Sequence, residues 1–300
     1  MRRWEGKIIR SITWIAAAVL ITAVILLVAH LSANNLEFSR YNVGWNGTSS
    51  FFSDLDRHRT TDITDPAQLA GFPRNSTLLI VAPYRHPDPR ELIAYQTFLD
   101  EGNTIFIADD FGTGNEILSG IGSRITISHI NLSSLDRQYP DPYSLIVYRS
   151  QENSSVILPP DLALNRPTSL EGGSPLMLTS VMSWMDTNSD RRLNLNEPMG
   201  TFPVMADESR GAGRIIVLAD PSIFINSMYI QGENANNRLF IHNLISGDGP
   251  LLIDQINSRT ADASGLSGIL HVIRNTEIIE IILLCLLMLF AAWAWKERTI

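Results

Sequence analysis

A short, almost unbroken apolar run at residues 104–108, TIFIA, places the strongest constraint on the fold of this chain. It is rich in β-branched and aromatic residues, it follows Gly102, and it ends at Asp109 and Asp110. Runs of this kind are typical of strands that are buried on both faces, as in the centre of a parallel sheet. Ligands of open α/β sheets bind outside the carboxyl ends of such strands, so we expect a site in the turn that follows.

Strand and helix patterns alternate around this run. Residues 77–82, TLLIVA, and 215–219, IIVLA, are two further buried strand patterns, and helical patterns lie at residues 48–57, 89–99, 114–118 and 236–245. This order predicts an α/β fold with a parallel sheet and right-handed crossovers. Residues 125–170 carry alternating patterns bounded by prolines, so we expect residues 122–212 to form an insertion or antiparallel flap.

Two long apolar segments lie near the ends of the chain, at residues 12–31 and 278–295. At about 1.5 Å per residue, each is long enough to cross a bilayer of about 30 Å as a helix. Basic residues before the first segment and after the second place both termini in the cytoplasm by the positive-inside rule. We therefore expect a cell-membrane protein with its central domain outside; a cleaved signal peptide at the first segment is the alternative.

These segments divide the chain into predicted parts. Residues 1–33 form a basic tail and a transmembrane helix, 34–255 an extracytoplasmic α/β domain, 256–277 a juxtamembrane linker, and 278–300 a second transmembrane helix with a basic tail. Four N-x-Ser/Thr sequons, which fit a glycosylatable surface but also arise by chance, lie at Asn46, Asn75, Asn131 and Asn153.

Charge and cysteine content narrow the range of functions. The formal net charge is -8 and the middle of the chain has no cluster of Lys and Arg, so we expect no nucleic-acid partner. The single cysteine, Cys285, lies in the second apolar segment, which excludes disulfides within the chain and a thiol nucleophile in the central domain. No serine elbow accompanies His86 or His242, so we predict no catalytic residues.

The sharpest chemical motif is an EF-hand-like loop at residues 186–197, DTNSDRRLNLNE. Arg191 stands at its sixth position, where the sharp turn favours glycine, so a solvated acidic turn is the alternative to a structural calcium loop. Carboxylate, amide and backbone oxygens at this spacing suit Ca²⁺, the only cofactor that we predict. The predicted metal ligands are Asp186, Asn188, Asp190, Arg192, Asn194 and Glu197.

Polar residues that follow the buried strands form a second candidate site. Asp109, Asp110 and Asp220 end strands that should be neighbours, so they either meet as paired carboxylates or cap the helices that follow. The turn GTGN at residues 112–115 suits an anion but lacks the Lys of a phosphate loop. The candidate binding residues of this strand-end turn are Asp109, Asp110, Gly112, Asn115, Asp220 and Ser222.

Four segments together resemble a known family: YNVGWNGTSSFFSDL at 41–55, LLIVAP at 78–83, IFIADDFGTGN at 105–115 and IIVLADPSIFIN at 215–226. As a set they resemble domain-of-unknown-function family 4350, a membrane-anchored family with a core similar to class I glutamine amidotransferases. The resemblance implies a flavodoxin-like or glutamine amidotransferase-like parallel sheet flanked by helices, with one N-terminal and one C-terminal transmembrane helix. Where the amidotransferases carry a nucleophilic cysteine, this chain has Asp109, Asp110 and Phe111.

The expected function is a non-catalytic, membrane-anchored, extracytoplasmic binding or interaction module of unknown ligand, accessory to a transport or envelope complex. The expected partners are the lipid bilayer and other membrane proteins; the resemblance implies MoxR-type ATPase systems or ABC-type exporters. The alternative is a hydrolase or metal-dependent enzyme that uses the strand-end aspartates.

Overall fold

The computed structural model describes residues 19, 21–23, 35–55, 60–136, 138–150, 157–230, 235–245, 247 and 249–262. The chain divides into two compact units, one formed by Asn35–Asp262 and the other by Met1–Asn34 with Ala263–Ile300. Residues 263–277 of the predicted linker, Asn153, Cys285 and the predicted membrane segments, apart from residues 19 and 21–23, lie outside the described residues.

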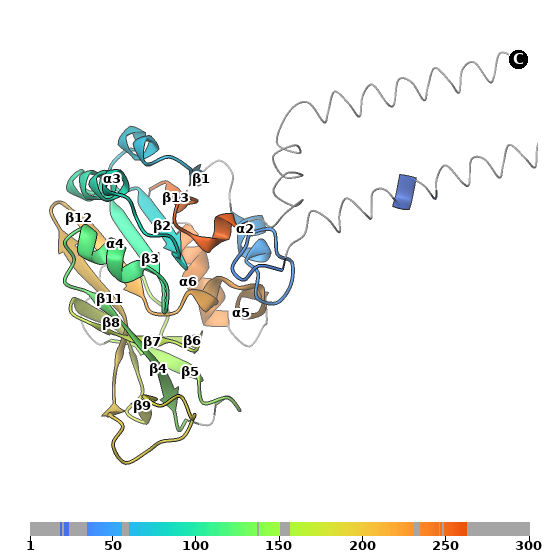
Figure 1. The fold of residues 1–300 in the computed structure, drawn as a ribbon, viewed down its shortest axis with the longest axis vertical. Helices are drawn as coiled ribbons and strands as arrows, with labels where there is room; N and C mark the ends of the chain where they lie inside the picture. The colour runs from blue at the N-terminus through green and yellow to red at the C-terminus, as the bar shows by residue number, and fades with distance from the viewer. Residues whose placement is uncertain are drawn as a thin grey trace, which may run out of the picture. The chain divides into compact units, whose positions relative to one another are not determined.

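The described unit contains thirteen strands and several short helices (Figure 1). The strands are β1 Thr60–Ile63, β2 Thr77–Val81, β3 Thr104–Ala108, β4 Thr126–Ser134, β5 Ser144–Arg149, β6 Asp161–Asn165, β7 Thr168–Glu171, β8 Ser174–Thr179, β9 Ser183–Met185, β10 Met199–Gly200, β11 Pro203–Arg210, β12 Gly213–Leu218 and β13 Leu251–Asp254. The helices are α2 Ser49–Asp54, α3 Pro89–Asp100, α4 Gly114–Gly120, α5 Asn226–Ile230 and α6 Ala235–Ile245, with 3-10 turns η1 Pro66–Gly71, η2 Pro221–Phe224 and η3 Arg259–Ala261.

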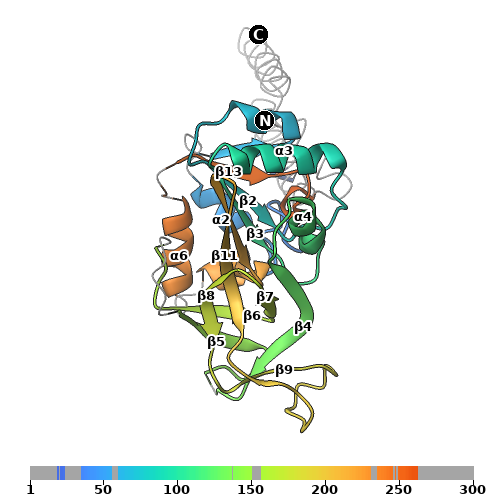
Figure 2. The same ribbon diagram turned by 90° about the vertical axis from the view of Figure 1, so that its left-hand side faces the viewer.

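The main sheet has nine strands in the order β1-β13-β2-β3-β12-β11-β8-β5-β6. The first five are parallel to one another. The last four continue the sheet in antiparallel fashion, starting from the β12–β11 pair. A second sheet, in the order β10-β9-β4-β7, is built around the long strand β4, which runs from the α4 side of the main sheet to β9 (Figure 2).

This mixed sheet corrects the prediction of a flavodoxin-like or glutamine amidotransferase-like parallel sheet flanked by helices. Residues 122–212, predicted as an insertion or flap, supply β5, β6, β8 and β11 to the main sheet. The connection between β11 and β12 consists of Gly211 and Ala212 alone, and so short a link permits only antiparallel pairing. Since no crossover helix follows these strands, this half of the sheet cannot be parallel.

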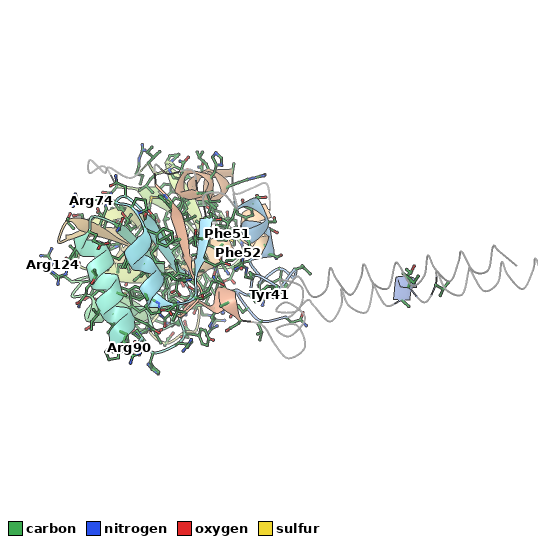
Figure 3. All side chains as sticks on the ribbon, turned by 90° about the horizontal axis from the view of Figure 1, so that it is seen from above. Tyr41, Phe51, Phe52, Arg74, Arg90 and Arg124 are labelled. Atoms are coloured by element: carbon green, nitrogen blue, oxygen red, sulfur yellow. The ribbon has the colours of Figure 1, made fainter. Side chains whose placement is uncertain are left out.

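The predicted strands and helices of the parallel half are confirmed, including β2, β3, β12, α3, α4 and α6. Alternate residues of each central strand face opposite layers, because side chains in a strand have a period of two. In β2, Leu78 contributes to the core under α3 and α4, whereas Leu79 contributes to the core under α2 and α6. Phe51 of α2 is buried in this core under α2 and α6, and Phe52 packs against it; both are labelled in Figure 3.

No helix in the described ranges is long and apolar enough to cross a membrane. The longest of them, α3, has 12 residues and at about 1.5 Å per residue is much shorter than a bilayer of about 30 Å. The predicted transmembrane helices at residues 12–31 and 278–295, and the membrane location inferred from them, are therefore not borne out by the described residues. Apart from residues 19 and 21–23, both segments lie outside the described residues.

Candidate functional site

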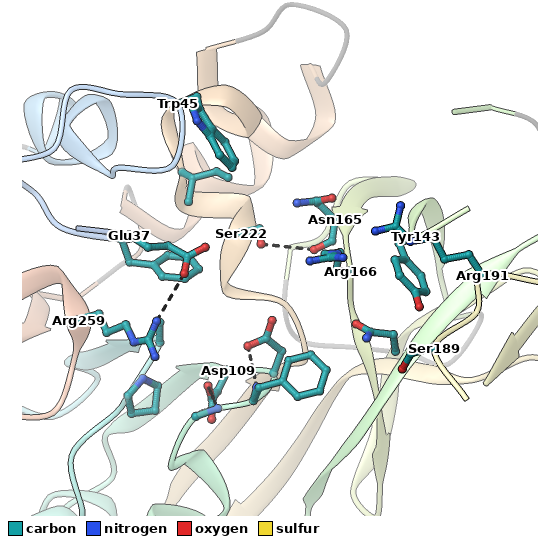
Figure 4. Close-up of a pocket in the computed structure, with 18 residues that line it drawn as sticks. Glu37, Trp45, Asp109, Tyr143, Asn165, Arg166, Ser189, Arg191, Ser222 and Arg259 are labelled. Atoms are coloured by element: carbon teal, nitrogen blue, oxygen red, sulfur yellow. Dashed lines mark hydrogen bonds and ion pairs between the residues drawn. The ribbon is translucent and has the colours of Figure 1, made fainter. Parts of the chain in front are cut away.

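A cleft of about 610 Å³ opens at the carboxyl ends of β2, β3 and β12 (Figure 4). Segments that are distant in the sequence line it, and the loop at 186–197 contributes as well as the strand ends. The lining residues are Glu37, Phe38, Trp45, Ala82, Pro83, Asp109, Asp110, Phe111, Gly112, Asn131, Tyr143, Asn165, Arg166, Ser189, Arg191, Ser222, Ile225 and Arg259.

Asp109 is buried at the floor of the cleft and stabilises the turn that follows β3. Its carboxylate accepts hydrogen bonds from the backbone N–H groups of Gly112, at 3.0 Å, and Gly114, at 2.7 Å. Burial raises the pKa of Asp109 to about 7, although these N–H groups act in the opposite direction. Burial also raises the pKa of Asp110, which is half-buried and accepts a hydrogen bond from the N–H of Phe111.

Asp220 is fully buried after β12 and joins two segments of the cleft wall. It accepts hydrogen bonds from the N–H of Ser222, at 2.7 Å, and from the N–H of Asn165, at 2.6 Å. Burial and the nearby charge of Asp110 raise its pKa to about 7. Ser222 lines the cleft and its hydroxyl donates to the Asn165 carbonyl at 3.3 Å. Because β3 and β12 pair in parallel, the strand-end aspartates follow neighbouring strands, as predicted.

Two of the predicted strand-end residues, Gly112 and Asn115, use polar groups in hydrogen bonds within the fold, so these groups are not free to bind a ligand. Asn115 does not line the cleft, and its side-chain amide accepts from the N–H of Ile127 and donates to the Ile127 carbonyl, each at 2.8 Å. The N–H groups of Gly112 and Gly114 are occupied by Asp109, so the GTGN turn does not offer them to an anion.

Replacing Gly112 by alanine is expected to lower the free energy of unfolding by about 1–3 kcal/mol, as overpacking does. An added Cβ would lie 2.0 Å from the carbonyl oxygen of Pro83 and 2.5 Å from Oδ1 of Asp109. Gly71→Ala is the matched control, because a Cβ there meets nothing within 4 Å. Urea unfolding of both variants measures the difference, and equal stability would contradict the tight packing of this turn.

The EF-hand-like loop folds around two of its own carboxylates. Asp186 accepts hydrogen bonds from the N–H of Asp190, at 3.2 Å, the N–H of Arg191, at 2.9 Å, and the hydroxyl of Tyr143, at 2.5 Å. Glu197 accepts from the N–H of Thr187, at 2.9 Å. Both carboxylates are therefore enclosed within the loop.

The remaining predicted calcium ligands also bond within the loop. Asp190 accepts from the N–H of Arg192 at 2.8 Å, and Asn194 donates to the Arg192 carbonyl at 3.0 Å. Asn188 accepts from the N–H of Asp190 at 3.0 Å. Across the described ranges, no group of three or more His, Cys, Asp or Glu side chains is placed to hold a metal ion. A cation would have to share these oxygens with the N–H groups of the loop, and calcium binding stays a prediction.

Several cleft residues were not predicted as functional, above all Trp45, Tyr143 and Arg166. They come from separate segments and belong to none of the chemical motifs described for the sequence, although Trp45 lies within the family segment at 41–55. The two candidate histidines lie outside the cleft lining: His86 pairs with Glu116 at 2.8 Å on the surface, and His242 lies on α6 beside a separate cavity.

The fold and the cleft define an α/β protein with a mixed sheet and a concave site at the carboxyl ends of its parallel strands. The chain belongs to the family described as a domain of unknown function, DUF4350, whose profile matches residues 40–245. The family resemblance is thereby confirmed, whereas its amidotransferase-like core and its membrane anchoring are not. No curated protein matches the chain.

Three solved structures resemble part of the fold. The mmIFT52 N-terminal domain has 16% identity and a TM-score of 0.45, with 61% of this chain and 82% of that chain covered. The beta-galactosidase from Bacillus circulans sp. alkalophilus has 12% identity and a TM-score of 0.32, with 54% of this chain and 22% of that chain covered. A cytoplasmic protein from Salmonella typhimurium LT2 has 10% identity and a TM-score of 0.34, covering 54% and 66%. These TM-scores are too low to support an inference about function.

Proposed function

We propose that residues 35–262 form a non-catalytic ligand-binding module whose site is the cleft at the ends of β2, β3 and β12. The observation that supports this most strongly is the backbone conformation around the cleft. Six non-glycine residues in the described ranges have a positive φ angle, and five of these line the cleft: Phe38, Ala82, Arg166, Ser189 and Arg191. Such angles cost about 1–2 kcal/mol per residue and are concentrated at functional sites.

The size and chemistry of the cleft also support binding of a small molecule. Its volume of about 610 Å³ is within the range of roughly 300–1,000 Å³ that is common for such sites. Absence of catalysis is proposed because Asp109 and Asp220 each hold two backbone N–H groups, which is the behaviour of structural carboxylates. MoxR-type ATPase systems and ABC-type exporters stay predicted partners, supported by the family resemblance alone.

A screen of the full chain against a library of water-soluble metabolites, by saturation-transfer NMR, tests the proposal. We expect compounds whose signal is lost with Trp45→Ala, since Trp45 lines the cleft. The signal should be kept with Ile93→Ala, because Ile93 is a similarly exposed apolar residue of α3 outside the cleft lining. A library without any Trp45-dependent compound would rule the proposal out.

The second candidate function is acid–base catalysis by the aspartates of the cleft floor. It is favoured by the pKa of Asp109, which burial raises to about 7, because a general acid or base works best with a pKa near the working pH. Incubation of each bound compound with the protein distinguishes the two functions. If the protein converts a compound and Asp110→Asn abolishes the conversion, the protein is an enzyme and not a binding module. If the compounds stay unchanged, the binding function is retained.

A further inference from the structure

Two arginines on one wall of the cleft have guanidinium groups without strong partners. Arg166 and Arg191 lie 5.4 and 5.0 Å from the ring centroid of Tyr143. Within the described part of the chain, the Arg166 side chain has no hydrogen bond or ion pair, and the carboxylate paired with Arg191 is Asp141, at 3.7 Å. That distance exceeds a hydrogen bond. Both guanidinium groups are therefore available to a carboxylate or phosphate, which arginine binds in a bidentate manner.

The backbone angles at these two positions do not require an arginine side chain. Arg166 has a φ angle of 63° and Arg191 one of 61°. Glycine adopts such angles without steric conflict, so the local conformation gives no reason for an arginine at either position. Apart from their contacts with the Tyr143 ring, both side chains line the cleft.

Exposed aromatic rings line the same cleft. Trp45 is 68% exposed and Phe111 is 47% exposed, although both are large apolar side chains. Trp45 lies across the cleft from Arg166, Tyr143 and Arg191 (Figure 4). An exposed indole at a cleft wall offers a flat apolar face on which a ring can stack.

The floor offers hydrogen-bond acceptors. Asp110 lines the cleft and keeps acceptor capacity beyond its bond to the N–H of Phe111. Its carboxylate can accept hydrogen bonds from hydroxyl groups of a bound molecule.

Building on the proposed function of the cleft, we infer that its ligand is a hydroxylated ring that carries a carboxylate or a phosphate group, as uronic acids and sugar phosphates do. The anionic group binds the guanidinium groups of Arg166 and Arg191. The ring stacks on Trp45, and its hydroxyl groups donate to Asp110. The anion and the hydroxyl groups are thus recognised at different parts of the cleft.

Isothermal titration of the full chain with glucuronate, glucose 6-phosphate, glucose and inorganic phosphate tests this inference. We expect at least one of the two anionic sugars to bind at least about tenfold more tightly than glucose and inorganic phosphate, a difference of about 1.4 kcal/mol. Preference for glucuronate assigns a carboxylate ligand, and preference for glucose 6-phosphate assigns a phosphate ligand.

The double variant Arg166→Gly, Arg191→Gly removes both guanidinium groups while the backbone angles remain favourable for the new residues. It is expected to keep its melting temperature and to lose the preference for the anionic sugar over glucose. Trp45→Ala is expected to weaken binding of the anionic sugar about tenfold, and Ile93→Ala to leave it unchanged.

Equal affinity for glucose and for both anionic sugars, or a double variant that folds and still prefers the anion, would overturn the inference. Failure of both anionic sugars to bind would overturn it as well. The metabolite screen then tests the proposed function separately. Trp45-dependent binding of uncharged compounds would support the ligand-binding function, whereas no binding of any compound would contradict that function as well.

Discussion

Replacement of Asp254 by alanine is expected to lower the free energy of unfolding by about 3–5 kcal/mol, since each buried donor that is left without an acceptor costs about 1–3 kcal/mol. Asp254 ends β13, is fully buried, and accepts four hydrogen bonds. The donors are the hydroxyl of Tyr95 at 3.0 Å, the N–H of Asn257 at 2.8 Å, and the N–H and hydroxyl of Ser258 at 2.9 and 3.0 Å. Alanine would leave these buried donors without an acceptor.

The effect is large because this network connects three elements. The Ser258 hydroxyl also accepts from the N–H of Val81 at the end of β2, and the amide of Asn257 donates to the Tyr95 hydroxyl on α3 at 2.9 Å. The loss of one carboxylate therefore weakens the contacts of β2, β13 and α3 together. Side-chain networks of this kind are worth more than separate pairs.

Urea unfolding monitored by far-UV circular dichroism measures this loss. Asp62→Ala is the matched control, since Asp62 lies on the edge strand β1 and makes an exposed ion pair with Arg40 at 2.6 Å. Exposed pairs contribute about 0–1 kcal/mol, so the control should differ little from the wild type. Similar losses in the two variants would show that the Asp254 network does not stabilise the fold as inferred.

Stability is expected to fall as the pH rises from about 4 to about 7, because of Asp109 and Asp220. Burial raises the pKa of each carboxyl from 3.8 to about 7, so in this window the folded protein retains protons that the unfolded chain has released. The folded state then loses up to about 1.4 kcal/mol per pH unit for each group, on the order of 4 kcal/mol in total per group. Above about pH 7 the effect of these two groups is complete and the contribution levels off.

Unfolding free energies at pH 5, 6, 7 and 8 test this dependence as about one-unit steps across the window. Asp109→Asn and Asp220→Asn are each expected to reduce the slope between pH 5 and 7, and the double variant to reduce it further. Asp190→Asn is the control: a hydrogen bond from Asn194 lowers the pKa of Asp190, so this group is ionised throughout. An unchanged slope in the double variant would contradict the raised pKa values.

Local sequence patterns predicted the segments of the parallel half because their causes are local. Asp88, Pro89 and Glu91 begin α3, where Asp88 accepts from the N–H of Glu91 and the Glu91 side chain accepts from the N–H of Asp88. The apolar run of β3 is buried on both faces, as the composition of this run requires. The strand-end aspartates also lie where a parallel arrangement of β3 and β12 places them.

These local patterns could not predict which distant strands pair with one another. The two-residue turn at Gly211 and Ala212 makes β11 and β12 antiparallel, and from there the sheet continues through β8, β5 and β6. The EF-hand-like spacing was visible, but the hydrogen bond from Tyr143 to Asp186 depends on a residue just before β5, which is distant in the sequence. The cleft likewise joins Glu37 to Arg259 through an ion pair at 3.5 Å.

The sequence by itself determined which segments form the buried strands, where several helices begin, and that carboxylates follow the central strands, since each depends on neighbouring residues. Only the tertiary structure decided the mixed sheet and brought Trp45, Arg166 and Arg191 to one cleft. The physical reason is that strand order and cleft lining depend on contacts between distant segments, whose free energy is set by packing across the whole sheet and not by local propensity.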